Sequence, residues 1–150
     1  MLYIHIYFGY NLTMTKNQIS LDFVSDLKYT EFCVLVFSFI KNVLNISDED
    51  LFKIEISLRE IVNNAILHGN KMDPEKRVYV TFRWSKKRFY VSIKDESQEK
   101  VNFGEIDKQL ENNDLLCCHG RGIMIVKNYM DKVRFLSSSH GTTIMMEKQI

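Results

Sequence analysis

The sequence predicts an α/β (α+β) two-layer sandwich, in which a mostly antiparallel mixed sheet carries its helices on one face. Three observations indicate this class. Apolar and polar residues alternate in two neighbouring segments within 78–93, as expected for a hairpin with one buried face, and a closing pair of strands is expected within 133–146. Apolar residues spaced three and four apart indicate two amphipathic helices between residues 25 and 69. The length of 150 residues suits a single domain.

The first strand of this domain is predicted at residues 19–23, where apolar and polar side chains alternate. We therefore assign the domain to residues 19–150 and interpret residues 1–18 as an N-terminal extension. The start of the extension is aromatic and apolar and contains no Lys, Arg or small-residue cleavage site, which argues against a signal peptide. Met14 opens a more conventional start, so a native and a non-native extension both stay open.

Two helices are expected after this strand. The first begins at about Ser25 or Asp26 and should bury one apolar stripe. The stripe consists of Phe32, Leu35, Val36, Phe39, Ile40, Val43 and Leu44. The second helix begins at Ser47, where Asp50 completes a capping box, and it ends at Gly69, where a left-handed residue is expected.

The second half of the chain reads as hairpin, polar segment, helix and hairpin. The strands of the first hairpin are expected at 78–84 and 89–93. Residues 96–119 are polar and irregular, with one short helix expected around 103–110. The closing elements are a helix over 122–130 and strands over 133–136 and 142–146.

Composition argues against several function classes. The net charge of +1 provides no overall attraction to nucleic acid or to an acidic membrane. The longest apolar run, Phe32 to Phe37, is far shorter than the ~20 residues that span a bilayer. The odd count of 3 cysteines fits reduced thiols in the cytosol. We expect a cytoplasmic protein that neither contacts nucleic acid directly nor enters a membrane.

The second helix carries the first candidate site. Glu60, Asn64 and His68 follow one another at intervals of four, so in an α-helix they line one flank. A carboxylate one turn from an amide suits a base that aligns a nucleophile beside an amide oxygen that completes a Mg²⁺ shell. On spacing alone, a solvated helix face is the competing interpretation.

Two further features have the residue types of a phosphate or nucleotide site. Gly120-Arg121-Gly122 opens a predicted helix, where converging backbone N–H groups favour phosphate, although a lone Gly-x-Gly is usually a turn. Asp95 ends a strand, where a carboxylate can accept a hydrogen bond from an adenine amino group or can simply initiate a turn.

Taken together, these motifs resemble the GHKL superfamily of ATPases, and within it the anti-sigma-factor serine/threonine kinase branch. Residues 60–70 resemble the N box, and the run onward to Val78 resembles the anti-sigma branch. Residues 93–96 match the entry to the first glycine box, 120–131 the second glycine box, and 141–143 the closing Gly-Thr element. The resemblance, which runs from about residue 19 to 148, implies the histidine-kinase-like ATPase (Bergerat) fold.

The resemblance also implies a role for each matching residue, with ATP and Mg²⁺ as cofactors. Glu60 would be the general base and Asn64 the Mg²⁺ ligand. Asp95 would bind the adenine amino group, supported by Thr142. Residues 96–119 would form a lid, and the remaining cofactor-binding residues would be His68, Gly120, Arg121 and Gly122.

In the resembling family the kinase phosphorylates a serine of an antagonist protein of the STAS type, and the same domain withholds a sigma factor from RNA polymerase. The resemblance therefore implies these two partners and a homodimer.

One departure from the family's pattern opens a second hypothesis. The first glycine box usually reads Asp-x-Gly-x-Gly, whereas this sequence has Ser97 and Glu99 at the two glycine positions. A negatively charged side chain beside a polyphosphate weakens nucleotide binding. The alternative function is a non-catalytic partner-switching module with a degraded nucleotide site. The catalytic domain of a sensor histidine kinase is a weaker third hypothesis, because no phosphoacceptor helix or membrane segment precedes the domain.

Overall fold

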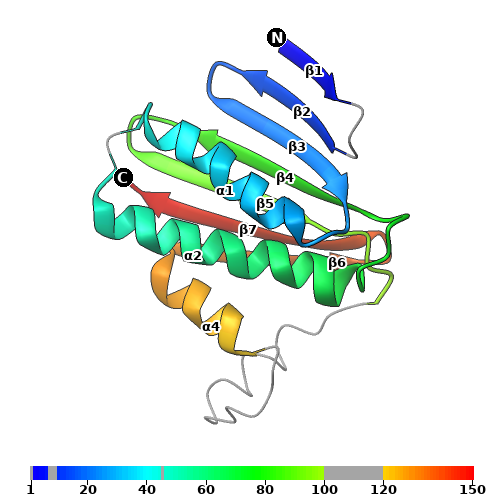
Figure 1. Cartoon of the computed structure of the whole chain (residues 1–150). Coiled ribbons are helices and arrows are strands. Elements are labelled where there is room, and N and C mark those ends of the chain that lie inside the picture. Colours follow the sequence, from blue (N-terminus) through cyan, green and yellow to red (C-terminus); the bar gives the residue numbers. More distant parts are fainter. Residues whose placement is uncertain (1, 7–9, 45, 100–119) are drawn as a thin grey trace.

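The computed structural model describes residues 2–6, 10–44, 46–99 and 120–150. Its strands are β1 (Leu2–Ile6), β2 (Tyr10–Thr15), β3 (Gln18–Val24), β4 (Arg77–Trp84), β5 (Arg88–Lys94), β6 (Lys132–Ser138) and β7 (Gly141–Gln149). Its helices are α1 (Lys28–Lys41), α2 (Asp48–Asn64), the π-helix η1 (Ala65–Gly69) and α4 (Gly120–Tyr129). The strands form one sheet in the order β1-β2-β3-β4-β5-β7-β6, with every described pair antiparallel. The helices lie together on one face (Figure 1). The predicted two-layer sandwich is confirmed.

Alternation along the central strands places the core between the sheet and the helices. Burial alternates along β3, β4 and β5, so each strand buries every second residue. These buried side chains include Ile19, Leu21, Phe23, Val78, Val80, Phe82, Phe89, Val91 and Ile93. They pack in one cluster with helical residues that include Phe37, Ile40, Ile54, Leu58, Ile61 and Val62. The opposite face of the sheet carries the polar members of the alternation, such as Ser20, Thr81 and Ser92.

The N-terminal residues extend this sheet at its edge, which the sequence interpretation did not foresee. β2 pairs with β3, placing Leu12 beside Leu21 and Met14 beside Ile19. Leu12 and Met14 are partly buried against the core, because their alternation continues the apolar face of β3. The assignment of residues 1–18 to an extension outside the domain stays a prediction.

The predicted buried stripe of α1 is wrong in part. Val36 and Ile40 are buried as expected, but Leu35, Phe39 and Val43 are 66%, 55% and 63% exposed. Apolar residues surround almost the whole helix, so their spacing does not identify the face that packs. The residues that complete the buried face are Tyr29, Cys33, Val34 and Phe37. The helix also begins later than expected, at Lys28, whose N–H donates to the Asp26 carboxylate over 3.0 Å.

The predicted start of α2 is confirmed, and the helical run ends at Gly69 as predicted, although its last part is the π-helix η1 and the left-handed residue expected at Gly69 is wrong. Ser47 Oγ accepts from the Asp50 N–H over 3.1 Å and donates to the Asp50 carboxylate over 2.9 Å. At the other end, Gly69 is not left-handed; the residues with positive φ are Lys71 and Met72, both at 56°. The reversal comes later because α2 continues into η1, where the N–H of residue 70 bonds to the Ala65 carbonyl.

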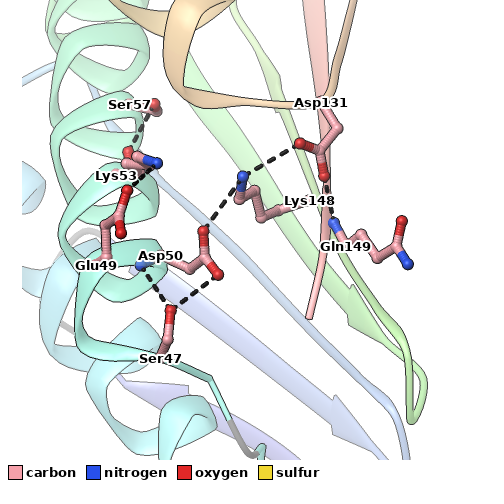
Figure 2. A network of polar contacts seen from close by, with 8 residues as sticks. All are labelled: Ser47, Glu49, Asp50, Lys53, Ser57, Asp131, Lys148 and Gln149. Atoms are coloured by element: carbon pink, nitrogen blue, oxygen red, sulfur yellow. Dashed lines mark hydrogen bonds and ion pairs between the residues drawn. The ribbon is translucent and has the colours of Figure 1, made fainter.

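A buried lysine connects three elements at the end of the molecule where α2 begins (Figure 2). Lys148 Nζ in β7 lies 3.2 Å from an Asp50 oxygen in α2 and 3.1 Å from an Asp131 oxygen just after α4. The Gln149 N–H donates to the other Asp131 oxygen over 2.6 Å. We call Lys148, Asp50 and Asp131 the lysine clamp.

The remaining elements agree with the sequence prediction apart from their exact ends. α4 begins two residues before the predicted 122, and β6 and β7 are longer than predicted. The short helix expected around 103–110 lies outside the described residues. Among the residues that the structure describes, no helix is long and apolar enough to cross a membrane.

Candidate functional site

The carboxylate and the amide predicted to share one flank of α2 meet the first turn of α4. A Cβ atom added to Gly122 would lie 2.5 Å from a carboxylate oxygen of Glu60 and 3.6 Å from the amide nitrogen of Asn64. Both side chains are half-buried. The missing side chain at Gly122 therefore leaves the room that the Glu60 carboxylate occupies between the two helices.

The two adjacent asparagines of α2 have different environments. Asn63 Oδ1 accepts a hydrogen bond from the Thr30 hydroxyl of α1 over 2.8 Å. Asn64 instead faces α4 at Gly122, because neighbouring residues on an α-helix point about 100° apart. Asn63 thus joins the two helices, while Asn64 belongs to the candidate site.

His68, the third member of the predicted row, lies in η1 and not in α2. Its side chain is exposed. A π-helix has wider turns than an α-helix, so α-helical spacing does not describe the step from Asn64 to His68. The α-helical spacing on which the row was predicted therefore applies to Glu60 and Asn64 only.

Asp95 directly follows β5 and is buried, with 5% of its surface exposed. Its Oδ1 accepts hydrogen bonds from the backbone N–H groups of Thr142, over 2.8 Å, and of Ser97, over 2.9 Å. The Asp95 N–H donates to the Thr142 carbonyl over 3.0 Å. The structure therefore brings Asp95 and Thr142 together through the Thr142 backbone, while the Thr142 hydroxyl lies 3.5 Å from that of Ser137.

Two glycines lie close to Asp95, Gly69 at its side chain and Gly141 at its backbone carbonyl. A Cβ atom on Gly69 would lie 2.3 Å from Asp95 Oδ2, and one on Gly141 would lie 2.0 Å from the Asp95 carbonyl oxygen. Gly141 also has φ +127°, a conformation that other residues rarely adopt. Oδ2 accepts no hydrogen bond from the described residues, so it is available to a ligand that approaches beside η1.

Burial raises the pKa of Asp95 above its ordinary value. The hydrogen bonds from Thr142 and Ser97 and the positive charges of Lys76 and Lys94 act in the opposite direction. These four groups favour the ionised carboxyl, which is the form that only accepts hydrogen bonds.

Gly120, Arg121 and Gly122 form the first turn of α4, and Arg121 is exposed. The first N–H groups of a helix have no partner within it, and the helix dipole adds positive potential there. This turn can therefore hold an anion directly beside Glu60 and Asn64. Most of the predicted lid, residues 100–119, lies outside the described residues.

The two substituted glycine positions have specific contacts. Ser97 does not have a positive φ, so its backbone conformation does not require glycine. Its hydroxyl accepts from the Glu99 N–H over 3.2 Å. The Glu99 carboxylate is 72% exposed and pairs with Lys71 Nζ over 2.6 Å.

Sequence reasoning missed one buried polar residue of this region, Asn70, which is 0% exposed. It lies at the end of the N-box stretch, but no periodicity or charge pattern singled it out. An asparagine directly after a glycine at a predicted helix end is the sequence signal that could have drawn attention to it.

Comparisons with known proteins show the family of this chain. Residues 26–148 match the histidine kinase-like ATPase domain family. The anti-sigma F factor of Oceanobacillus iheyensis is 33% identical over 141 residues, covering 90% of this chain and 94% of that protein. The anti-sigma F factor of Bacillus subtilis is 33% identical over 138 residues, with the same two coverages.

A solved structure shows the same fold at lower sequence identity. The crystal structure of the RsbU and RsbW domains of a Mycobacterium tuberculosis protein matches 86% of this chain with a TM-score of 0.57 and 14% identity. This chain spans 32% of the length of that one.

The fold and the family match define a domain of the GHKL type, for which ATP binding is implied. The chain belongs to the histidine kinase-like ATPase domain family. Its similarity to the anti-sigma F factors supports an anti-sigma regulator built on such a domain.

The residues present fit ATP and Mg²⁺. The Glu60 and Asp95 carboxylates fill the space left by the missing side chains of Gly122 and Gly69, so both acceptors lie directly against the backbone of α4 and η1. No group of three or more His, Cys, Asp or Glu side chains in the described part could hold a metal by itself. Mg²⁺ commonly needs only one or two protein ligands when it also binds substrate phosphates, so the Asn64 amide oxygen suits this use.

Proposed function

We propose that the protein is an anti-sigma regulatory factor and an ATP- and Mg²⁺-dependent serine/threonine kinase that phosphorylates an antagonist of the STAS type. The observation that carries this proposal is the meeting of the Glu60 carboxylate and the Asn64 amide at Gly122, in the first turn of α4. A base, a metal ligand and an anion-binding helix start are the groups that phosphoryl transfer requires.

Glu60 is the proposed general base. Its carboxylate would accept the proton of the antagonist's serine hydroxyl as that oxygen bonds to the γ-phosphorus and the bond from the phosphorus to ADP breaks. Its place between α2 and α4 restricts the side chain, since Gly122 leaves it only limited space. Positioning of this kind is the main contribution that a protein makes to phosphoryl transfer.

The remaining residues would hold the nucleotide. Asn64 would bind Mg²⁺, which neutralises phosphate charge when bound. Asp95 Oδ2 would accept a hydrogen bond from the adenine amino group, and Thr142 would support it through its backbone. The phosphates would lie at the start of α4, with further contacts from His68, Gly120, Arg121 and Gly122.

The proposed partners follow from the names of the relatives and from the family resemblance. We propose that the protein binds a sigma factor as well as its STAS antagonist, that it is a homodimer, and that it acts in the cytoplasm without contacting DNA directly. The near-neutral charge of the chain agrees with the absence of a DNA contact.

Two substitutions on α2 test the kinase. Glu60→Gln keeps the shape of the side chain, so Mg-ATP binding should persist while phosphorylation of the STAS protein falls by ~10²–10⁴-fold. Asn64→Ala should weaken Mg²⁺-dependent binding itself. Calorimetry with Mg-ATP and a phosphorylation assay measure the two effects, with Asn63→Ala as the matched control outside the site. Full phosphorylation by Glu60→Gln would contradict the role of the base.

Ser97 and Glu99 favour the second candidate function, a partner-switching module without catalysis. Glycine at both positions, in the variant Ser97→Gly/Glu99→Gly, should leave Mg-ATP affinity within about threefold if the kinase proposal holds, since Glu99 pairs with Lys71. If the wild type binds no Mg-ATP at millimolar concentration and the double variant does, the kinase proposal fails and the module is favoured.

A further inference from the structure

Asn70 is a fully buried amide that joins two strand ends. Its Oδ1 accepts from the Glu96 N–H over 2.8 Å, and its Nδ2 donates to the Arg77 carbonyl over 2.9 Å. Its own N–H bonds to the Ala65 carbonyl across η1. Burying an amide is unfavourable unless its polar atoms are paired, so these bonds hold Asn70 in one place.

The segment that Asn70 holds is the one that carries Asp95. The ladder between β4 and β5 ends at Tyr79 and Lys94, so residues 95 and 96 have no backbone partner in β4. On the β7 side, the Thr142 backbone holds Asp95. On the β4 side, Asn70 takes the place of the missing ladder.

A second contact supports the same segment from the surface. The Glu96 carboxylate accepts from the Arg77 N–H over 2.8 Å and from the Tyr79 hydroxyl over 2.7 Å. The Arg77 N–H therefore bonds to the Glu96 side chain, and the Arg77 carbonyl bonds to Asn70, whose amide oxygen in turn holds the Glu96 N–H. Of the two side chains, Asn70 is fully buried, whereas Glu96 is half-buried.

The position of Asp95 matters because adenine and guanine differ at the group it would meet. Adenine presents an amino group, which donates to a carboxylate, whereas guanine presents a carbonyl oxygen, which a carboxylate repels. A displaced Asp95 would lose the favourable contact with adenine and reduce the repulsion of guanine.

We propose that Asn70 is a positioning residue that holds Asp95 for adenine recognition and so contributes to the preference for ATP over GTP. This inference rests on nucleotide binding in the proposed function. Asn70 acts through the Glu96 backbone and would not itself touch the nucleotide.

The test compares Asn70→Ala with Asn63→Ala, which removes the same side chain from the adjoining helix but breaks only the bond to Thr30. Calorimetry with Mg-ATP and with Mg-GTP gives the ratio of the two dissociation constants. We expect Asn70→Ala to reduce the preference for ATP by about tenfold, the effect of one lost hydrogen bond, and Asn63→Ala to leave it unchanged. In Asn70→Asp the buried carboxyl is neutral, so it can accept from the Glu96 N–H and donate to the Arg77 carbonyl; this variant should retain most of the preference and serves if Asn70→Ala does not fold.

Three outcomes would overturn the inference. If Asn70→Ala folds and keeps the wild-type preference for ATP, the inference about Asn70 fails while the proposed function stands. The same follows if Asn70→Ala weakens the binding of ATP and GTP equally, because that result indicates a merely structural role. The same holds if Asn70→Asp loses the preference completely while remaining folded. A wild-type protein that binds neither nucleotide overturns the proposed function as well.

Discussion

At the scale of single residues, two glycines of the site are required for different physical reasons. Gly122 lies in a helix with ordinary backbone angles, and a side chain there would collide with the flexible tip of Glu60. Gly141 has φ +127°, and a side chain there would collide with the Asp95 carbonyl oxygen, which belongs to the backbone. A side chain can move aside at low cost, whereas a backbone oxygen held by neighbouring strands cannot.

We therefore expect Gly122→Ala to reduce activity without loss of stability, and Gly141→Ala to reduce stability. Gly122→Ala should leave the free energy of unfolding unchanged or raise it by up to about 1 kcal/mol, because Ala favours helix. It should lower phosphorylation by about 10²-fold, since Glu60 is displaced. Gly141→Ala should reduce the free energy of unfolding by about 3 kcal/mol. Denaturant unfolding and the kinase assay measure both; an active Gly122→Ala variant would contradict the close approach of Glu60.

At the scale of elements, α2 connects two regions with separate tasks. Its first turn contributes Asp50 to the lysine clamp, and its far end leads through η1 to Gly69 and Asp95. A helix rises 1.5 Å per residue, so these regions lie about 25 Å apart. The clamp fixes the start of α2 and the end of α4 to β7, and thereby sets how the two helices that carry Glu60 and Gly122 lie on the sheet.

The clamp predicts a stability change without a change in nucleotide preference. Lys148→Met should lower the free energy of unfolding by about 1 kcal/mol at neutral pH, because the half-buried Asp50 and the exposed Asp131 lose their cation. The ATP-to-GTP preference should stay unchanged at the distant site. Lys86→Met, on the exposed turn between β4 and β5, is the matched control and should have no effect on stability.

The same comparison has a defined pH dependence. Hydrogen bonds from the Gln149 N–H and from Lys148 lower the pKa of Asp131. A carboxyl with a lowered pKa stabilises the fold above its ordinary pKa of about 3.9 and loses this contribution as pH falls through the lowered value. The stability difference between wild type and Lys148→Met should therefore shrink below about pH 4. A difference that grows with acidity would contradict the pairing of Lys148 with Asp131.

At the scale of the whole molecule, a bound nucleotide would connect parts that are distant in the chain. The candidate site draws on α2, η1, the end of β5, the start of α4 and the start of β7. A ligand that contacts all of them can bind only the folded protein, so it raises stability by mass action.

We expect Mg-ATP at a hundred times its dissociation constant to stabilise the fold by about 2.7 kcal/mol, which raises the melting temperature by roughly 5–10 °C. Glu60→Gln should keep this shift and Asn64→Ala should lose most of it, because only the amide is proposed to bind the metal. Thermal unfolding followed by circular dichroism measures the shift. No shift in the wild type under these conditions would argue for the partner-switching module.

Sequence patterns determined the fold class, most of the elements from β3 onward and the placing of Glu60 and Asn64 on one flank of α2. Alternation identified β3, β4 and β5 because a half-buried strand must alternate, and Ser47 identified the start of α2 because its cap is a local hydrogen bond. Glu60 and Asn64 were found because a spacing of four is itself a spatial relation in a helix.

Only the tertiary structure decided features that depend on contacts between distant segments. Which side of α1 is buried follows from where the sheet and α2 lie, since apolar residues surround that helix. The use of the Thr142 backbone for Asp95 and the place of Asn70 both arise from hydrogen bonds between segments far apart in the chain. A polar side chain does not reveal its partner through local periodicity, because the partner is chosen when the sheet and the helices pack.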